Sequence, residues 1–268
     1  MPAPFDPVAH RYDADFTDTP LGRRQRALVY RYLEPLVRPG ARVLELNCGT
    51  GEDATWMAAR GAEVMATDCS AGMLAVATQK ARNAGVAITF RQLPIQELGG
   101  LELPPGHPGF DLVFSNFDGL NCLPDLHFFP DAVAPLLRPG GGVMVVWMNP
   151  ICAMEIAGFA LRGRFGMAFQ RLRRGGTAAH IGDAEMVQTW FHPIWKMKRM
   201  FAQRFRFRTI AAIGLTTPPT LMRHWYHRHQ RLFQRFFPME ERLMGTPPLN
   251  RLGDHTLLHC VLKGNAGE

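Results

Sequence analysis

One stretch decides the fold of this chain: Val43-Leu44-Glu45-Leu46-Asn47-Cys48-Gly49-Thr50-Gly51-Glu52-Asp53-Ala54. The apolar run at its start predicts a buried strand, and the two glycines predict a tight turn directly after it. Helical periodicity from Ala54 onward predicts a helix that begins at this turn. Backbone N–H groups and the positive end of the helix dipole face whatever lies above such a turn, so it suits the edge of a nucleotide-like ligand.

Two ligand classes use this arrangement. Gly49-x-Gly51-x-x-Ala54 also matches the dinucleotide fingerprint, so the glycines alone do not separate them. Glu45 separates them, because a carboxylate just before the turn suits a cationic ligand and would repel a pyrophosphate. Asn47 stands first in the turn, where many relatives would have glycine, and asparagine tolerates positive φ better than most residues.

The stretch from Val43 to Ala54 resembles motif I of the class I S-adenosylmethionine-dependent methyltransferases of small-molecule type. The likeness extends from Phe5 to Lys263, although the specific motifs lie within residues 41–148. It implies a Rossmann-like α/β fold with a doubly wound seven-stranded sheet. The sheet would be mostly parallel with one antiparallel strand near the C-terminus, and a helical lead-in and a lid insertion would accompany it. The implied cofactor is S-adenosylmethionine, with S-adenosylhomocysteine as product.

Length and composition restrict the possible domain organisation and cellular location of the protein. A chain of 268 residues suits one methyltransferase domain, divided into a lead-in (5–37), a cofactor-binding core (41–148), a lid (149–203) and closing strands with a helix (204–263). No apolar run reaches the ~18–20 residues of a membrane span, and the N-terminus lacks the order of a secretory signal, so we expect a cytoplasmic protein. Five cysteines without a Cys-x-x-Cys pair argue against a disulfide framework and a zinc ribbon, and we expect no metal.

The next strands supply polar groups at their carboxyl ends. Residues 63–68 read as a strand that ends in Asp68, whose carboxylate can accept both ribose hydroxyls of an adenosine. By resemblance, Met73 in the following helix lies on one face of the adenine. After the third strand, residues 88–92, Pro94 stands where relatives usually place an acid, so the backbone of Ile95 or the side chain of Gln96 would have to recognise the base.

Residues 110–115 form the fourth predicted strand. Ligands bind outside the carboxyl ends of strands in an open parallel sheet, so the loop that follows faces cofactor and substrate. By resemblance, Asn116 and Phe117 contact the methionine amino group through their backbone. Asp118 and Asn121 either point to the reacting side or cap the turn.

The lead-in is expected to cover the cofactor. By resemblance, Arg26 meets the methionine carboxylate, with Arg23 as second choice, and Tyr12 and Phe16 lie against the sulfonium, where an aromatic face favours a cation. All these side chains are equally compatible with ordinary exposed or core positions. The full predicted cofactor set is Tyr12, Arg26, Glu45, Asn47, Gly49, Gly51, Asp68, Cys69, Met73, Ile95, Asn116, Phe117 and Asn121.

The second half of the chain is expected to complete the sheet and cover the substrate. We predict a helix at 126–137, a strand at 143–147, a lid from 149 to about 182, a helix at 184–203, and final strands at 205–213 and 255–263. Residues 161–210 carry eleven Arg and Lys side chains against two acids. This excess fits an anionic acceptor bound by Arg171, Arg173 and Arg174, a nucleic acid, or plain solvated helix faces.

No catalytic group stands out. His127, His180, His192 and Asp118 could each take a proton from an acceptor hydroxyl, but each is also compatible with a structural role. His224-x-x-His227-x-His229 has no carboxylate or cysteine nearby in sequence, so we do not read it as a metal site.

The sequence thus predicts a methyltransferase that acts on an O, N or C nucleophile of a small organic, anionic acceptor, as a monomer or homodimer. The alternatives are an RNA methyltransferase that uses the basic 161–210 segment, a nicotinamide-dependent oxidoreductase, and a cofactor-binding module without chemistry. The loop after the fourth strand lacks the Asp/Asn-Pro-Pro-aromatic motif of enzymes that methylate adenine and cytosine amino groups, so nucleic acid is not expected as a partner.

Overall fold

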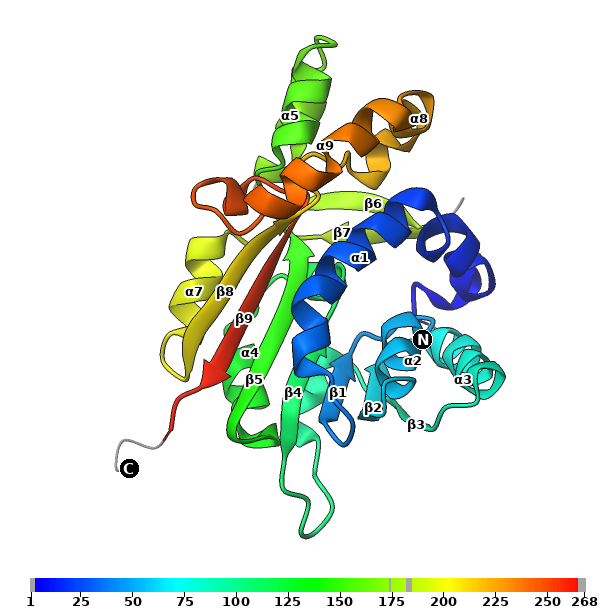
Figure 1. Cartoon of the computed structure of the whole chain (residues 1–268), viewed down its shortest axis with the longest axis vertical. Helices are drawn as coiled ribbons and strands as arrows, with labels where there is room; N and C mark the ends of the chain where they lie inside the picture. The colour runs from blue at the N-terminus through cyan, green and yellow to red at the C-terminus, as the bar shows by residue number, and fades with distance from the viewer. Residues whose placement is uncertain (1–2, 174, 182–184, 265–268) are drawn as a thin grey trace.

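The computed structural model describes residues 3–173, 175–181 and 185–264. A seven-stranded sheet with the order β3-β2-β1-β4-β5-β9-β8 runs through it (Figure 1). β1 to β5 are parallel, and β9 is antiparallel to both of its neighbours, which confirms the predicted sheet. The strands are β1 (Arg42–Leu46), β2 (Glu63–Asp68), β3 (Ile88–Gln92), β4 (Phe110–Ser115), β5 (Leu137–Met148), β8 (Phe205–Ile213) and β9 (His255–Leu262). Chain order reverses between β1 and β4, the point where open sheets of this kind bind ligands.

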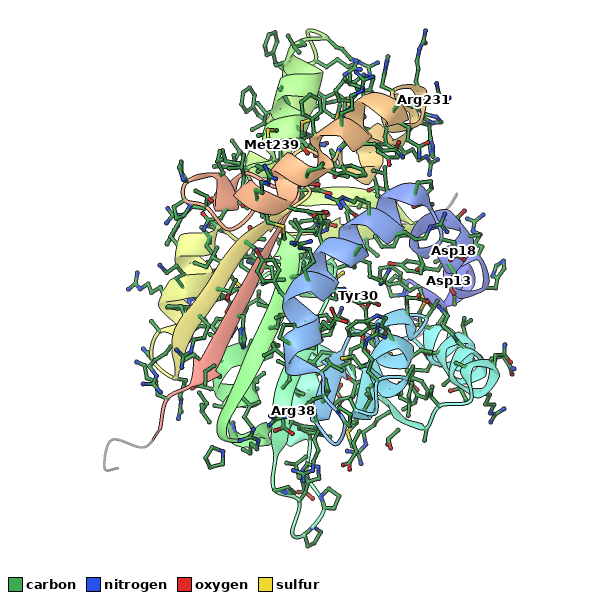
Figure 2. The ribbon with its side chains drawn as sticks, in the orientation of Figure 1. Asp13, Asp18, Tyr30, Arg38, Arg231 and Met239 are labelled. Atoms are coloured by element: carbon green, nitrogen blue, oxygen red, sulfur yellow. The ribbon has the colours of Figure 1, made fainter. Side chains whose placement is uncertain are left out.

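The lead-in is helical, as predicted, but in three different forms. A 3-10 helix, η1 (Asp6–Arg11), is followed by a π-helix, η2 (Asp13–Thr17), and by α1 (Pro20–Leu33), which Thr19 caps. The Asp6 carboxylate accepts hydrogen bonds from the Ser70 hydroxyl and the Gly72 amide, and Asp13 pairs with Lys80 at 2.8 Å. Figure 2 labels Asp13 and Tyr30 where the lead-in meets the core helices.

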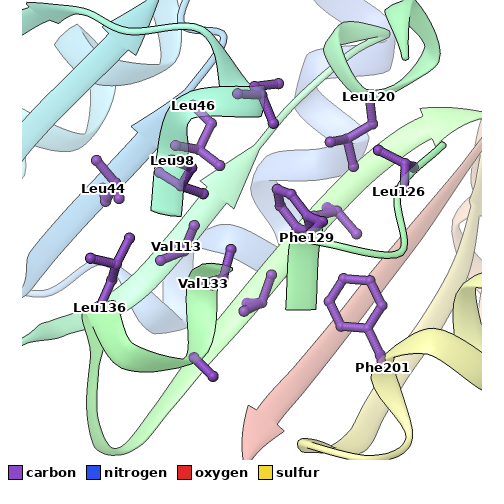
Figure 3. Packing of buried hydrophobic residues seen from close by; sticks show 14 of the residues in the cluster. Leu44, Leu46, Leu98, Val113, Leu120, Leu126, Phe129, Val133, Leu136 and Phe201 are labelled. Atoms are coloured by element: carbon purple, nitrogen blue, oxygen red, sulfur yellow. The ribbon is translucent and has the colours of Figure 1, made fainter. Parts of the chain in front are cut away.

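Helices cover the sheet on both faces, and each face has its own apolar core. α1, α2 (Glu52–Ala58) and α3 (Ala71–Ala84) cover one face, and α4 (Phe129–Val133) and α7 (Ile194–Phe201) cover the other. The alternation of β1 divides the two: Leu44 and Leu46 pack in the core shown in Figure 3, whereas Val43 packs in the other. Each fully buried leucine contributes about 1.5–3 kcal/mol relative to an exposed one. Glu45 lies on the same side of β1 as Val43, so its side chain enters the α1–α2 face.

The remaining elements lie beyond the carboxyl ends of the parallel strands, at the top of Figure 1. They are α5 (Ala153–Ala160), α6 (Phe165–Ala168), α8 (Arg223–Arg228), α9 (Gln230–Leu243) and a two-stranded sheet of β6 (Thr177–Ile181) and β7 (Glu185–Thr189). The 3-10 turns are η3 (Glu34–Leu36), η4 (Ile95–Gly100), η5 (Gly119–Cys122), η6 (Ala134–Leu136), η7 (Gln170–Leu172), η8 (Thr220–Met222) and η9 (Leu249–Arg251). No helix in the described part of the chain is long and apolar enough to span a membrane.

Two helix predictions need correction. The helix predicted at 184–203 exists only as α7, and residues 185–189 form strand β7 instead. Val187 and Thr189 are β-branched and favour a strand, and Pro193 begins the helix only four residues later. The helix predicted at 126–137 is shorter, because it starts at Phe129 and tightens into η6 after Val133.

Candidate functional site

The turn after β1 has the left-handed geometry that its sequence predicts. Asn47, Gly49 and Gly51 have φ angles of 47°, 53° and 74°. A Cβ on Gly51 would lie 2.7 Å from the Cβ of Ala77, so α2 begins this close to α3 only because residue 51 is glycine. The Gly49 amide donates a hydrogen bond of 2.9 Å to the Asp68 carboxylate, which joins the turn to the end of β2.

Asp68 lies beside the glycine turn, and its contact with an adenosine stays a prediction. Its carboxylate is 8% exposed and also accepts a hydrogen bond from the Ser70 amide at 2.9 Å. Burial raises the pKa of Asp68 above its ordinary value, although the backbone N–H bonds from Ser70 and Gly49 oppose this. Each carboxylate oxygen has accepted one backbone bond and keeps a further lone pair, so two ligand hydroxyls could still bind.

A buried group of charges lies on the α1–α2 face below the turn. Arg26 Nε and the Tyr30 hydroxyl both donate to Asp53 Oδ1 at 2.7 Å, and Asn116 Nδ2 donates to Asp53 Oδ2 at 2.8 Å. Glu45 is 2% exposed, and its Oε2 has no hydrogen-bond partner. Arg26 Nη1 is likewise buried and unpartnered.

These two orphaned atoms have opposite polarity. Burial, followed by the nearby Asp53 carboxylate, raises the pKa of Glu45 well above its usual range. The pKa of Arg26 is raised, because Asp53 outweighs the burial of its guanidinium. The site therefore offers a carboxylate oxygen and a guanidinium N–H to one ligand, which would supply a cation and an anion in return.

Aromatic side chains connect the lead-in to the loop after β4. The ring centroids of Tyr12 and Phe16 are 5.7 Å apart, and those of Phe16 and Phe117 are 5.8 Å apart. The Arg26 guanidinium lies 5.3 Å from the centre of the Phe117 ring. Tyr12 and Phe117 of the predicted cofactor set thus belong to one contiguous wall with Arg26.

The loop after β4 is fixed by Asn47. Its Nδ2 donates to the Asn116 carbonyl at 2.7 Å, and its Oδ1 accepts from the Ser115 hydroxyl at 2.6 Å. A Cβ on Gly119 would lie 2.2 Å from Asn47 Cγ, so the loop packs directly on this amide. Asn47 therefore braces the site with its side chain, a role that a glycine at this position could not have.

Asn121 and His192, one of the predicted proton acceptors, have structural partners. Asn121 is fully buried, accepts from the Met148 amide at 2.7 Å and donates to the Trp190 carbonyl at 2.7 Å, so its side chain joins β5 to β7 instead of facing a ligand. His192 is 3% exposed and bonded to the Leu123 carbonyl, and burial lowers its pKa.

The remaining predicted catalytic and cofactor residues differ in their exposure to solvent. His127 is exposed and bonded to Asp125, and His180 lies in β6. Cys69 is exposed beside Asp68, and burial raises its pKa to about 11. Met73 and Ile95 are buried at the start of α3 and η4, and their contact with adenine stays a prediction.

The lid arginines do not form a common binding surface. Arg171 is buried, and its guanidinium bonds to Glu155, to Asp254 and to the carbonyls of Asn149 and Asp254, so it is not free to bind an acceptor. Charge in the sequence could not reveal these partners, which lie 16 and 83 residues away. Arg173 is exposed, and Arg174 lies outside the described residues.

One functional candidate was missed by the sequence reasoning. His255, the first residue of β9, has Nε2 3.0 Å from Asp118 Oδ1 and Nδ1 3.4 Å from Asp254 Oδ2. Asp118 and His255 are 137 residues apart, so no local motif joins them. A signal existed nevertheless, because an antiparallel strand begins at the edge where its parallel neighbours end.

Cys152, Glu155 and Asp254 place potential metal-ligand atoms within 4.8 Å of one another. Both carboxylates already bind the Arg171 guanidinium. A cation there would have to displace a buried arginine, so we do not read these residues as a metal site.

Comparison with known proteins gives consistent matches. Residues 43–141 match the model of a methyltransferase domain family. The ubiquinone biosynthesis O-methyltransferase of Alkalilimnicola ehrlichii is 35% identical over 116 residues, which are 41% of this chain and 42% of that protein. The chain spans about half the length of the curated relatives it matches.

Solved structures share the fold at low identity. A putative S-adenosylmethionine-dependent methyltransferase from Listeria monocytogenes superposes with a TM-score of 0.59 at 15% identity, covering 90% of this chain and 99% of that one. The cyclase SpnF superposes with a TM-score of 0.56 at 14% identity, covering 88% and 80%. Because a cyclase has the same fold, the fold alone does not decide the reaction.

Proposed function

We propose that this chain, which carries a methyltransferase domain within the class I S-adenosylmethionine-dependent methyltransferase fold, transfers a methyl group from S-adenosylmethionine to an oxygen of a small organic acceptor. The cofactor would supply an already activated methyl on a cationic sulfur. The protein's part is then to bind both molecules, align them and exclude water. Such positioning contributes on the order of 7–11 kcal/mol to a displacement.

The observation that carries the proposal is a pair of orphaned polar atoms beneath the turn, a carboxyl oxygen that can accept from a cation and a guanidinium N–H that can donate to an anion. Glu45 Oε2 and Arg26 Nη1 are buried without partners. The amino acid end of the cofactor has an ammonium and a carboxylate, so the two charges match. A dinucleotide has no ammonium group, and its pyrophosphate would be repelled by Glu45.

The other cofactor contacts follow from the same geometry. Asp68 would accept the ribose hydroxyls, Met73 would lie against the adenine, and the Tyr12 ring would stand near the sulfonium. The lead-in closes over this site through Asp6 and Asp13, so the cofactor would be largely enclosed once bound.

Oxygen is proposed as the acceptor atom because the relatives that match in sequence are named O-methyltransferases. The RNA alternative is weakened by the distribution of the basic residues. Arg162 lies after α5, Lys198 in α7 and Arg206 in β8, and Figure 1 shows α5 at the top and the other two elements at the left edge. The basic side chains of the described residues are thus spread over separate elements instead of lining one of them.

Calorimetric titration with S-adenosylhomocysteine and NAD, side by side, tests the cofactor. We expect S-adenosylhomocysteine to bind, NAD not to bind, and Asp68→Asn to weaken the first by at least about tenfold, equivalent to about 1.4 kcal/mol. Glu97→Gln, an exposed carboxylate change in η4, is the matched control and should leave affinity unchanged. Binding of NAD in preference to S-adenosylhomocysteine, or no effect of Asp68→Asn, would overturn the proposal.

Transfer itself is tested with methyl-labelled S-adenosylmethionine and a fractionated cell extract. We expect label in the small organic fraction and in a base-stable ether. Label in RNA, sensitive to ribonuclease, would favour the alternative. Binding of S-adenosylhomocysteine without labelling of any fraction would indicate a cofactor-binding module without chemistry.

A further inference from the structure

A chain of charged side chains leads from the reacting side of the site into the protein interior. The carboxylate of Asp118 accepts a hydrogen bond from His255 Nε2 at 3.0 Å, and His255 Nδ1 lies 3.4 Å from Asp254 Oδ2. Asp254 is held from behind by the Arg171 guanidinium at 2.6 Å and by Gln25 Nε2 at 2.8 Å. Residues of α1 and η7 thus hold Asp254, and Asp254 and the loop after β4 flank one histidine.

The exposed fraction of the side chains falls steeply from Asp118 to His255 and Asp254. The side chain of Asp118 is 41% exposed, whereas those of His255 and Asp254 are 4% and 3% exposed. Only Asp118 can therefore touch a substrate. The second oxygen of its carboxylate, Oδ2, is not used by His255.

The backbone at Phe117 and Asp118 adopts a conformation that is uncommon for residues other than glycine. Phe117 and Asp118 have φ angles of 44° and 62°, two consecutive left-handed residues without a glycine. Such conformations cost about 1–3 kcal/mol each and persist only when the surroundings impose them. Here the ion pair with His255 and the edge-on packing of the Phe117 ring on the imidazole, at 5.3 Å, impose them.

Carboxylates lie at both nitrogens of the His255 imidazole. Burial lowers the pKa of His255, but the carboxylates of Asp254 and Asp118 outweigh burial and raise it above the ordinary value, with Arg171 opposing from behind Asp254. The imidazole N–H donates to Asp118 Oδ1, which leaves Oδ2 available to a substrate.

Asp118 also lies beside the proposed cofactor site. Burial, followed by the Asp118 carboxylate, raises the pKa of Tyr12, so Asp118 lies within electrostatic reach of the lead-in. Gly119, the next residue, packs on Asn47 in the glycine turn.

We propose that Asp118 is the group that accepts the proton of the acceptor's nucleophile, that His255 is its positioning residue, and that the acceptor class is the neutral hydroxyl compounds. This inference rests on the proposed methyl transfer and deepens it. An acceptor that is already ionised, or a tertiary amine, would need no such group.

The step balances with the chain's own residues and the two substrates. The acceptor O–H bond breaks and its proton passes to Asp118 Oδ2, while the oxygen forms a bond to the methyl carbon. The bond between that carbon and sulfur breaks, and its electron pair stays on sulfur, which becomes neutral. Asp118 then releases its proton to solvent, which its exposure permits, and His255 keeps its own proton throughout.

The test compares full-length Asp118→Asn and His255→Gln with wild type, using two probe acceptors of different acidity, 4-methylphenol and the more acidic 4-nitrophenol. Asp125→Asn is the matched control, since this exposed carboxylate also pairs with a histidine, His127, but on the surface. Affinity for S-adenosylhomocysteine is measured for each variant to show that the cofactor site is intact.

We expect Asp118→Asn to lower kcat with 4-methylphenol by about 10²–10⁴-fold, the usual contribution of a positioned acid or base. The loss should be smaller with 4-nitrophenol, and the residual rate should rise with pH, because only the ionised acceptor then reacts. His255→Gln should lower kcat about tenfold with little change in KM, and Asp125→Asn should match wild type.

Equal losses with both phenols and a rate that does not respond to pH would overturn the proton-acceptor role. Turnover of an amine probe such as dimethylglycine without turnover of either phenol would overturn the hydroxyl assignment, and so would no turnover of any probe by a protein that binds S-adenosylhomocysteine. Failure to bind S-adenosylhomocysteine would instead reject the proposed function itself.

Discussion

Gly119 and Asn47 should be energetically coupled. A Cβ on Gly119 would lie 2.2 Å from Asn47 Cγ and 2.6 Å from Asn47 Nδ2. The amide cannot turn away freely, because it donates to the Asn116 carbonyl and accepts from the Ser115 hydroxyl. Gly119→Ala therefore has to displace a side chain that is bonded at both ends.

The magnitude follows from these contacts. Overpacking of this kind costs about 1–3 kcal/mol, and each of the two hydrogen bonds contributes about 0.5–1.5 kcal/mol. We expect Gly119→Ala to lower the free energy of unfolding by about 3 kcal/mol. Asn47→Gly alone should cost only about 1 kcal/mol, since the loss of both bonds is partly offset by relief at a φ of 47°.

The decisive variant is the double substitution. With Asn47→Gly in place, the Cβ at residue 119 has no amide to meet, so the pair should be about 2 kcal/mol more stable than additivity predicts. Urea denaturation of the four proteins measures this coupling, and Gly99→Ala, where a Cβ would meet nothing within 4 Å, serves as control. Additive effects of the two substitutions would refute the reasoning.

Two further predictions concern the buried charged residues Arg171 and His255. Arg171→Met should lower the free energy of unfolding by about 3–5 kcal/mol, because it leaves buried carboxylates unpaired. The control Arg173→Met changes an exposed arginine and should alter this free energy little. Equal urea midpoints for the two variants would contradict the burial assigned to Arg171. The pKa of His255 is raised above its ordinary value of 6.5, so its pairing with Asp254 and Asp118 stabilises the fold fully below pH 6.5, and this stabilisation is lost as the pH rises through the higher folded pKa. The stability difference between wild type and His255→Gln should therefore shrink as the pH rises above about 6.5. A difference that grows with pH would contradict this prediction.

Most strands of the central sheet could be predicted residue by residue, although β5 begins at Leu137, six residues before its predicted start, and the reason is local. β2, β3, β4 and β8 have the predicted bounds, because each combines a strand-like apolar pattern with a clear break at its end. The segment at 184–203 failed for the opposite reason. Its many aromatic residues suggested a helix, but large apolar side chains favour strands equally, and only the packing decides.

The residues of the candidate site likewise fall into two groups, those that local sequence predicts and those that it does not. The proposed cofactor-binding residues lie in short segments at strand ends. The motif at residues 43–54 and the carboxylate of Asp68 predict these segments from sequence alone. The interior partners of the site come from contacts across more than eighty residues, such as Arg171 with Asp254. Sequence shows that charges are present in the insertion, but not that one of them is buried as a counter-ion.

The antiparallel strand explains why the missed residue lies where it does. β9 enters the sheet at the edge where β4 and β5 end, since Met148, the last residue of β5, pairs with His255, the first residue of β9. The loop after β4 reaches the same edge, so Asp118 meets His255 without any motif in common. If β9 ran parallel to β5, its first residue would lie at the opposite edge. The strand that departs from the parallel pattern is therefore the one able to bring a side chain from the C-terminal region to the reacting side.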